Sequence, residues 1–305
     1  MPQPFEDPGA LVRWGLPASK LAFNMCAAVT IGAFVFAAFI LPPSSASYAR
    51  SQKVALVAAA SWTIVSFAGL SFTFLSLVPM NPFDSRFLQQ FGYFAEAIPL
   101  GQVWLITTLL AASLTLIAYV ADRPVHAAIG SAVAVVALLP VALTGHGAGD
   151  QGHGAAVTAL ALHMVGAALW LGGLLVLVSV RTTRDRGSLR VIVQRYSALA
   201  LSGFTVVTIS GVISATIQLG NFGNLASPYG LIVLAKGAIL ALLGFAGAWN
   251  RSRLIIRLDT PGRAAKAFWL IVSAELLLLG FVSGLAAGLG RTPPPELAPP
   301  AVSPS

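Results

Sequence analysis

Three histidines lie close together in the sequence of this 305-residue chain. His146 and His153 lie among glycines, and His163 follows inside an apolar run that begins near Ala155. Ionisable side chains are costly to place in such a run and usually mark a functional site. Because imidazole is a common ligand of transition metals, the pattern predicts a metal site at His163, with His146 and His153 capturing the ion. The alternative is that the two loop histidines are only solvated.

Sulfur-containing side chains supply further candidate ligands. Cys26 and Met25 lie in an apolar run that begins near Ala18, and Met164 follows His163. At 1.5 Å per residue, Cys26 and His163 both lie about 12 Å from the start of their helices, which predicts a similar depth. Thiolate and thioether ligands select Cu(I). We therefore expect copper as Cu(I), with Cu(II) as the alternative. The competing interpretation is that these sulfur side chains only fill apolar space.

Two charged residues lie inside other apolar runs. Lys236 is expected about 12 Å below the outer surface, and Glu275 near the middle of the last run. Intramembrane charges tend to pair with one another, and these two runs should be antiparallel neighbours. The pattern therefore indicates either a buried structural ion pair or a charged part of a translocation path.

The composition identifies the elements that must position these side chains. Hydrophobic residues make up 57% of the chain and charged residues only 9%, whereas a soluble domain has about 25% charged residues. A spanning helix needs about 20 apolar residues, and the chain contains eight such runs. We therefore predict an all-α integral membrane protein, a bundle of eight transmembrane helices. The runs are residues 18–41, 54–79, 99–120, 125–143, 155–180, 194–218, 228–249 and 266–289.

The distribution of basic residues predicts the orientation in the membrane. Of the 18 Lys and Arg residues, 13 flank one set of connections and only four flank the other. The more basic side should be cytoplasmic, so both termini and the histidine-bearing loop should face outward. Because the basic residues lie in short loops between spans, the net charge of +8 reflects this topology and excludes nucleic acid as a partner.

The parts outside the spans are short. Residues 1–17 are predicted to form an N-terminal tail, and residues 18–290 the membrane domain. The longest connection, residues 80–98, is rich in aromatic residues and is expected to lie at the membrane interface. The ending, residues 291–305, is rich in proline and is typical of a disordered tail or a linker to a further part of a longer protein.

Several segments, in order along the chain, resemble the CopD (PcoD-like) family of copper-resistance membrane proteins. The segments are "HMVGAALWLGGLLVL", "RYSALALSGFTVVTISGVISA" and "SPYGLIVLAKGAILALLGFAGAWNR". The similarity is strongest from His163 to Arg251, within a CopD-like core of about residues 155–289. The individual positions that carry the similarity are Arg195, Tyr196, Ser197, Ser210, Gly211, Tyr229, Gly230, Lys236, Asn250 and Arg251.

The resemblance implies a multi-pass protein of the bacterial inner membrane that handles copper and moves it across that membrane. It also implies that His163 and Lys236 are functional, because their positions match the pattern of the family. In some relatives a CopD-like half is fused to a cytochrome c oxidase assembly (CtaG-like) half, and the proline-rich ending is similar to such a junction. The implied partners are the lipid bilayer, the copper ion and either a periplasmic copper carrier or an oxidase assembly partner.

Two other functions remain open. The same ligands suit a factor that delivers copper during oxidase assembly without transporting it. A haem b electron-transfer protein would need two histidines at similar depth, whereas His126 is predicted at the opposite face from His163. We expect no enzymatic activity, because the sequence contains no recognisable set of nucleophile, base and orienting group. It also contains no nucleotide-binding P-loop, so any transport should not be driven by ATP.

Overall fold

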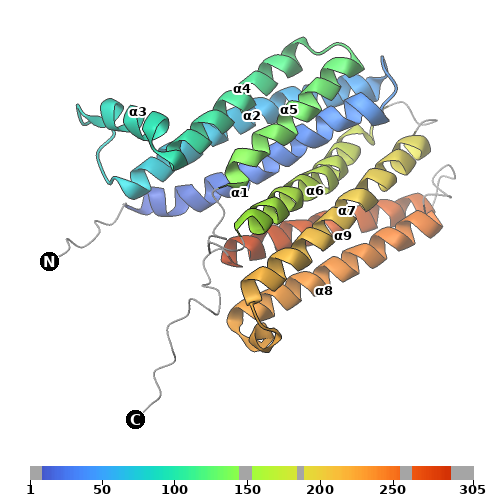
Figure 1. The fold of residues 1–305 in the computed structure, drawn as a ribbon. Coiled ribbons are helices and arrows are strands. Elements are labelled where there is room, and N and C mark those ends of the chain that lie inside the picture. The colour runs from blue at the N-terminus through green and yellow to red at the C-terminus, as the bar shows by residue number, and fades with distance from the viewer. Residues whose placement is uncertain (1–8, 144–152, 184–188, 255–262, 290–305) are drawn as a thin grey trace. The chain divides into compact units, whose positions relative to one another are not determined.

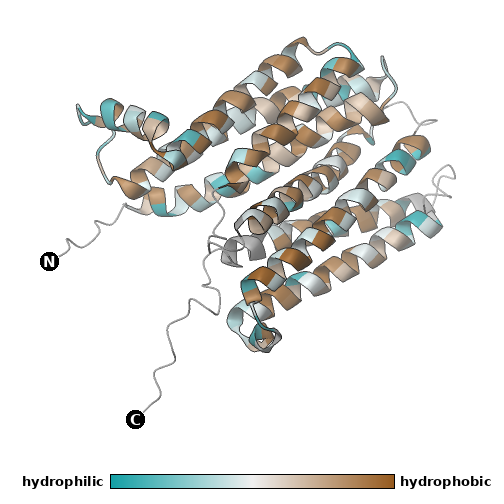
Figure 2. Cartoon of the chain, in the orientation of Figure 1, coloured by the Kyte–Doolittle hydropathy of each residue, from teal (hydrophilic) through white to brown (hydrophobic). Residues whose placement is uncertain are grey.

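The computed structural model describes residues 9–143, 153–183, 189–254 and 263–289, and these residues contain helices and no strand. Eight of the helical segments are long and apolar enough to cross a membrane, and Figure 2 shows that hydrophobic residues dominate along their length. The prediction of an all-α membrane protein with eight spans is therefore confirmed. Figure 1 labels the α-helices. Their bounds are α1 Gly9–Val35, α2 Ala46–Leu77, α3 Phe87–Ala97, α4 Pro99–Val120, α5 Pro124–Ala142, α6 His153–Val180, α7 Leu189–Leu219, α8 Pro228–Trp249 and α9 Arg263–Leu289.

The chain divides into two compact units. Unit 1 comprises residues 1–145 and 167–186, and unit 2 comprises residues 146–166 and 187–305. Unit 1 therefore contains α1 to α5 and the second half of α6. Unit 2 contains the first half of α6 together with α7, α8 and α9.

Several helices begin earlier than the apolar runs predict. Helix α1 begins at Gly9, so residues 9–17 of the predicted tail are helical. Helix α2 begins at Ala46, because the Ser45 side chain accepts a hydrogen bond from the Tyr48 amide at 3.0 Å and caps the helix. Polar first turns extend these helices beyond their apolar parts, because a helix end can lie outside the hydrocarbon layer where backbone and side chains are solvated.

Unit 1 has a densely packed core around α1. The ring of Phe23 in α1 makes edge-on contacts with Trp62 of α2 and Trp104 of α4, at centroid distances of 5.6 and 5.5 Å. On another side, Gly172 in the second half of α6 lies against the backbone of α1. A Cβ atom at Gly172 would lie 1.8 Å from the carbonyl oxygen of Ala28, so the two backbones touch only because the residue is glycine.

The long connection between residues 80 and 98 contains helix α3. Phe87 and Phe91 stack with their centroids 5.8 Å apart, and both rings make edge contacts with Phe74 of α2. The opposite side of the segment is open, since Phe83 is 95% exposed and Leu88 is 80% exposed. The segment is thus an amphipathic element packed on α2, which is the character expected of an interfacial segment.

In unit 2 a structured turn joins α7 to α8. After Gly220, which adopts a left-handed backbone with φ of 62°, a short 3-10 helix spans Phe222–Ala226. Ser227 then caps α8 by accepting a hydrogen bond from the Gly230 amide at 3.0 Å, and Pro228 occupies the first turn. The Tyr229 hydroxyl donates a hydrogen bond to Gln218 of α7. These contacts account for the "SPYG" sequence at this position.

The other end of α8 continues into a π-helical turn, Asn250–Leu254. Asn250 is buried, and its side-chain oxygen has no hydrogen-bond partner among the described residues. The guanidinium of Arg253 lies over the ring of Trp249, 5.3 Å from its centroid. Helix α9 packs against both α8 and this turn.

Candidate functional site

His163 lies in the first half of α6, and its imidazole is held against α7 within unit 2. Its Nδ1 atom lies 3.2 Å from the hydroxyl oxygen of Ser210, which is itself buried. The two helices approach closely one turn further along α6. There, a Cβ at Gly166 would lie only 3.0 Å from a methyl carbon of Val206 and 3.1 Å from the carbonyl oxygen of Gly203. This glycine contact allows Ser210 to reach the imidazole.

The hydrogen bonds of Ser210 determine which nitrogen of His163 carries the proton. The Ser210 hydroxyl lies 2.6 Å from the carbonyl oxygen of Val206 and 3.2 Å from that of Val207, and it donates its single hydrogen to this backbone. Its oxygen therefore accepts a hydrogen bond from Nδ1–H of His163. In the neutral ring, Nε2 then keeps a free lone pair.

This arrangement is the one that metal-binding histidines use in proteins. One ring nitrogen donates to a fixed acceptor, which orients the ring and selects the tautomer, and the other nitrogen binds the metal. Gly211 adds space beside the ring, since a Cβ there would lie 3.7 Å from Cε1 of His163 and 3.8 Å from its Nδ1. The Ser210–Gly211 pair singled out in the sequence is thus the surface of α7 on which the His163 ring rests.

Lys236 of α8 is the charged residue that the structure brings to His163. It is half-buried, and its ammonium is close enough to interact electrostatically with the imidazole. Helices α6 and α7 therefore contribute His163 and Ser210 to one polar contact in unit 2, and Lys236 of α8 exerts an electrostatic effect on the imidazole.

The expected ion pair between Lys236 and Glu275 does not occur in the described structure. No ion pair with an N–O distance of 4.0 Å or less joins them among the described residues. Glu275, at 7% exposure, is buried in α9 and lies within electrostatic range of the buried Tyr196 of α7. Two separate polar positions therefore exist in unit 2, one around His163 and the other around Glu275. A role for either charge in a translocation path stays a prediction.

The remaining predicted ligands are distributed over α6, α1 and residues that the structure does not describe. Met164 follows His163 in α6 and is half-buried. Cys26 and Met25 are half-buried in α1 and belong to unit 1. His153 is the first residue of α6, and His146 lies outside the described residues. Within the described part of the chain, no group of three or more His, Cys, Asp or Glu residues is arranged to hold a metal ion.

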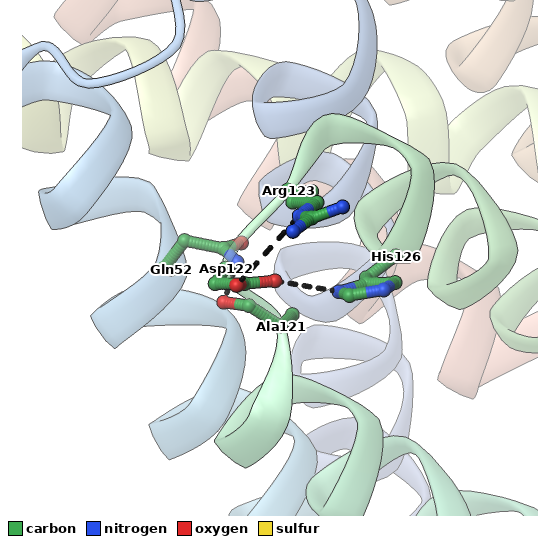
Figure 3. Close-up of polar contacts among 5 residues, drawn as sticks. All are labelled: Gln52, Ala121, Asp122, Arg123 and His126. Carbon is green, nitrogen blue, oxygen red and sulfur yellow. Dashed lines mark hydrogen bonds and ion pairs between the residues drawn. The ribbon is translucent and has the colours of Figure 1, made fainter.

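A second polar cluster, not identified as a site from the sequence, lies where α4 meets α5 in unit 1 (Figure 3). Nδ1 of His126 lies 2.9 Å from a carboxylate oxygen of Asp122, and the Arg123 guanidinium lies 3.9 Å from the other oxygen. From α2, the amide of Gln52 donates a 2.8 Å hydrogen bond to the carbonyl of Ala121. The feature of the sequence that could have predicted this cluster is the four-residue spacing of Asp122 and His126.

This cluster also bears on the haem alternative. His126 is engaged with Asp122 in unit 1, at the start of α5. In unit 2, His163 is the one histidine whose side chain the structure describes. Within the described part of unit 2, no second imidazole accompanies His163.

The fold defines a multi-pass helical membrane protein in which an imidazole inside one span is hydrogen-bonded to a neighbouring helix. A family model described as copper resistance protein D matches residues 190–289, and a second, described as the copper resistance protein D-like N-terminal domain, matches residues 10–157. The chain belongs to the CopD family of copper resistance proteins. No curated protein and no solved structure matches it.

The matched ranges locate the site within the family pattern. Ser210, Lys236 and Glu275 lie inside the range of the CopD model, and His163 lies between the two matched ranges. The predicted family is confirmed, and the match also covers the first five helices, where the resemblance in sequence was weaker. The choice of His163 as a candidate site residue therefore rests on its position in a span and on its contacts with α7.

Proposed function

We propose that this copper resistance protein carries copper across the bacterial inner membrane and that Nε2 of His163 binds the ion within the bilayer. The observation that supports the proposal is the hydrogen bond between Nδ1 of His163 and Ser210, which leaves Nε2 as a free ligand inside a membrane span. Burying such a group in a span is costly, and a polar site of this kind is retained where it has a function.

The chain also carries side chains that suit a soft cation. Met164 follows His163 in α6, and Cys26 and Met25 lie in α1 of unit 1. Cu(I) prefers such thioether, thiolate and imidazole ligands. We propose that both termini face the periplasm, because the basic residues lie mainly on the other side. His146 and His153 would then capture copper from a periplasmic carrier. The protein acts as a carrier, not as an enzyme.

The proposal is tested by copper binding and by transport in proteoliposomes. Cu(I) affinity is measured in detergent by competition with a coloured Cu(I) chelator, and the assay is repeated with Cu(II). Transport is measured with a chelator trapped inside the vesicles and, in a second preparation, with copper loaded inside. The two preparations distinguish influx from efflux.

The key variant is His163→Ala, with His126→Ala as its matched control on the other described histidine. Loss of His163 removes a direct ligand, so its effect should exceed the 10- to 100-fold that is typical when a supporting residue is removed, and we expect roughly 100-fold weaker binding or more. His126→Ala should bind copper as the wild type does.

Three outcomes contradict the proposal in different ways. Wild-type protein that neither binds nor moves copper beyond empty liposomes would exclude a copper carrier. Copper binding that depends on His163, without movement in either direction, would favour a factor that delivers copper for oxidase assembly. A purified protein with the Soret absorption of haem would favour the electron-transfer alternative.

A further inference from the structure

Two polar side chains in the core of unit 1 have no hydrogen-bond partner among the described residues. They are the indole of Trp62, through its Nε1–H group, and the hydroxyl of Ser66, both in α2. Both residues are 0% exposed, so neither group is satisfied by solvent at the protein surface. A buried polar group without a partner is rare and destabilising, because folding removes its hydrogen bond to water. Each of these groups therefore needs a partner other than the described protein atoms.

The hydroxyl of Ser66 also differs from other hydroxyls in the same helix. Thr63 and Thr73 each donate a hydrogen bond to the backbone carbonyl four residues earlier, at 3.0 and 2.7 Å. The equivalent acceptor for Ser66 is the carbonyl of Trp62, and the described structure forms no bond between them. Because the Ser66 hydroxyl is not used by its own helix, it is available to bind another group.

Helix geometry places these two residues close enough to share one small ligand. Ser66 follows Trp62 by four residues, so both side chains rise from the same face of α2, with their Cβ atoms about 5–6 Å apart. Two hydrogen bonds in series, each about 2.8–2.9 Å long, span a similar distance through a single oxygen atom. In unit 1, α2 packs along both α1 and α4, and the two residues belong to its buried side (Figure 1).

The neighbouring aromatic rings restrict the size of this ligand. The ring of Phe23 lies edge-on against Trp62, with the centroids 5.6 Å apart. One turn beyond Ser66, a Cβ at Gly69 would lie 2.6 Å from the ring of Trp104. The chemistry of the two groups also restricts its identity, since an indole N–H only donates and does not coordinate a metal ion. Water can accept from the indole and bond to the hydroxyl, and it is the smallest molecule that does both.

We propose that unit 1 contains a binding site for one internal water molecule, which accepts a hydrogen bond from Nε1–H of Trp62 and forms a second with the hydroxyl of Ser66. The water satisfies both groups and ties the Trp62 ring to the next turn of α2. It is thus a structural part of the aromatic core. The site lies in unit 1, whereas the proposed copper ligand His163 lies in unit 2, so the inference does not depend on the proposed function.

The first test observes the water at Trp62 by NMR. Wild-type protein in detergent is isotopically labelled at its indole nitrogens, and the Trp62 signal is assigned by its loss in Trp62→Phe. We expect a rotating-frame cross-peak between water and the Trp62 indole proton with the sign of a dipolar contact. Chemical exchange with bulk water gives the opposite sign, which is the behaviour expected of the exposed indole of Trp14. A Trp62 signal without the dipolar cross-peak overturns the inference.

The second test removes the other partner of the water. Ser66→Ala keeps the indole, so the dipolar cross-peak at Trp62 should disappear, and the unfolding temperature should fall by a few degrees because a buried N–H loses its partner. Ser71→Ala in the same helix is the matched control, since the Ser71 hydroxyl donates to the Phe67 carbonyl at 2.9 Å. It should keep the cross-peak. A cross-peak of wild-type strength in Ser66→Ala overturns the shared site.

A third measurement needs no variant and decides the question even if Trp62→Phe or Ser66→Ala does not fold. A high-resolution crystal structure of the wild-type protein should contain an ordered water within about 3.2 Å of both Nε1 of Trp62 and the hydroxyl oxygen of Ser66. Well-defined density for both side chains without such a water overturns the inference.

Discussion

The two units of this membrane protein differ in what their buried residues do. In unit 1, α1 has an almost continuously buried stretch from Ala27 to Val35, and Phe23 packs between two tryptophans. In unit 2, α8 has only three buried residues in its 22 positions, Tyr229, Gly230 and Leu243. Unit 2 nevertheless holds His163, Lys236 and Glu275, which are the ionisable groups singled out inside the spans. Tight apolar packing and intramembrane chemistry are thus concentrated in different parts of the chain.

This difference predicts that substitutions in the two units have different effects. Membrane helices gain stability mainly from close packing, because lipid is as apolar as a protein core. Unit 1 has this packing, whereas unit 2 holds the ionisable groups singled out inside the spans. Variants in unit 1 should therefore mainly change stability, and variants around His163 should mainly change ligand binding.

The largest effect is expected at the contact between α1 and α6 in unit 1. The substitution Gly172→Ala places a Cβ 1.8 Å from the carbonyl oxygen of Ala28, so the helices must separate. We expect a loss of about 3 kcal/mol or more, at the upper end for overpacked sites. The loss is measured by thermal unfolding in detergent. The control is Gly237→Ala in α8, where no atom lies within 4 Å of the new Cβ, so the same change should be nearly neutral. Equal effects at both glycines would contradict the difference between the units.

The next effect is expected at the support of His163. Ser210→Ala removes the acceptor for Nδ1–H, so the ring loses its fixed orientation and tautomer. Copper affinity should fall about 10- to 100-fold, while the unfolding temperature changes little. Ser202→Ala in the same helix is the matched control, because the Ser202 hydroxyl bonds only its own helix backbone, at 3.2 Å from Ala198. A loss of affinity in both variants, or in neither, would exclude the orienting role of Ser210.

A smaller effect is expected at the connection between α4 and α5. Gln52→Ala removes the 2.8 Å hydrogen bond to the carbonyl of Ala121, which ties α2 to the end of α4 (Figure 3). The expected cost is about 1 kcal/mol in the free energy of unfolding, the usual value for one such bond. Copper affinity should be unchanged, because the bond lies in unit 1. A variant that unfolds normally but loses copper binding would contradict the division between the units.

The smallest effect is expected at the neighbouring ion pair. Asp122→Asn weakens the contact with Nδ1 of His126, but the side chains of Asp122 and His126 are 70% and 40% exposed. Water screens exposed pairs, so stability should change by less than about 1 kcal/mol, and high salt should abolish the difference. Unfolding at low and high salt measures both. A change as large as that of Gln52→Ala would mean that the pair is effectively buried.

Much of the fold could be predicted from the sequence because membrane helices depend on one local property, a run of about 20 apolar residues. The ends of the helices were less predictable. Ser45 caps α2 nine residues before the start of the predicted apolar run, so the helix includes Arg50 and Lys53 in its first turns. Charged residues lowered the local hydropathy there, although the capping serine was visible in the sequence.

The site could be predicted only in part. His163 stood out because a single polar residue in an apolar run is a local signal. Its bond to Ser210 joins residues 47 positions apart, and it depends on how closely α6 and α7 pack at Gly166. The rotation of α8 and α9 about their axes likewise decides whether Lys236 meets His163 or Glu275. Helix order along the chain does not determine such rotations, which is why the expected ion pair was not found.

The capped turn between α7 and α8 has a mechanical consequence. The bond from Tyr229 to Gln218 and the Ser227 cap clamp the two helices together at one end. Lys236 lies eight residues after Pro228, about 12 Å along the helix from this clamp. Because these bonds fix the hairpin at this end, they set the position of α8 along α7. Any movement of this end of α7 would therefore carry the start of α8 with it.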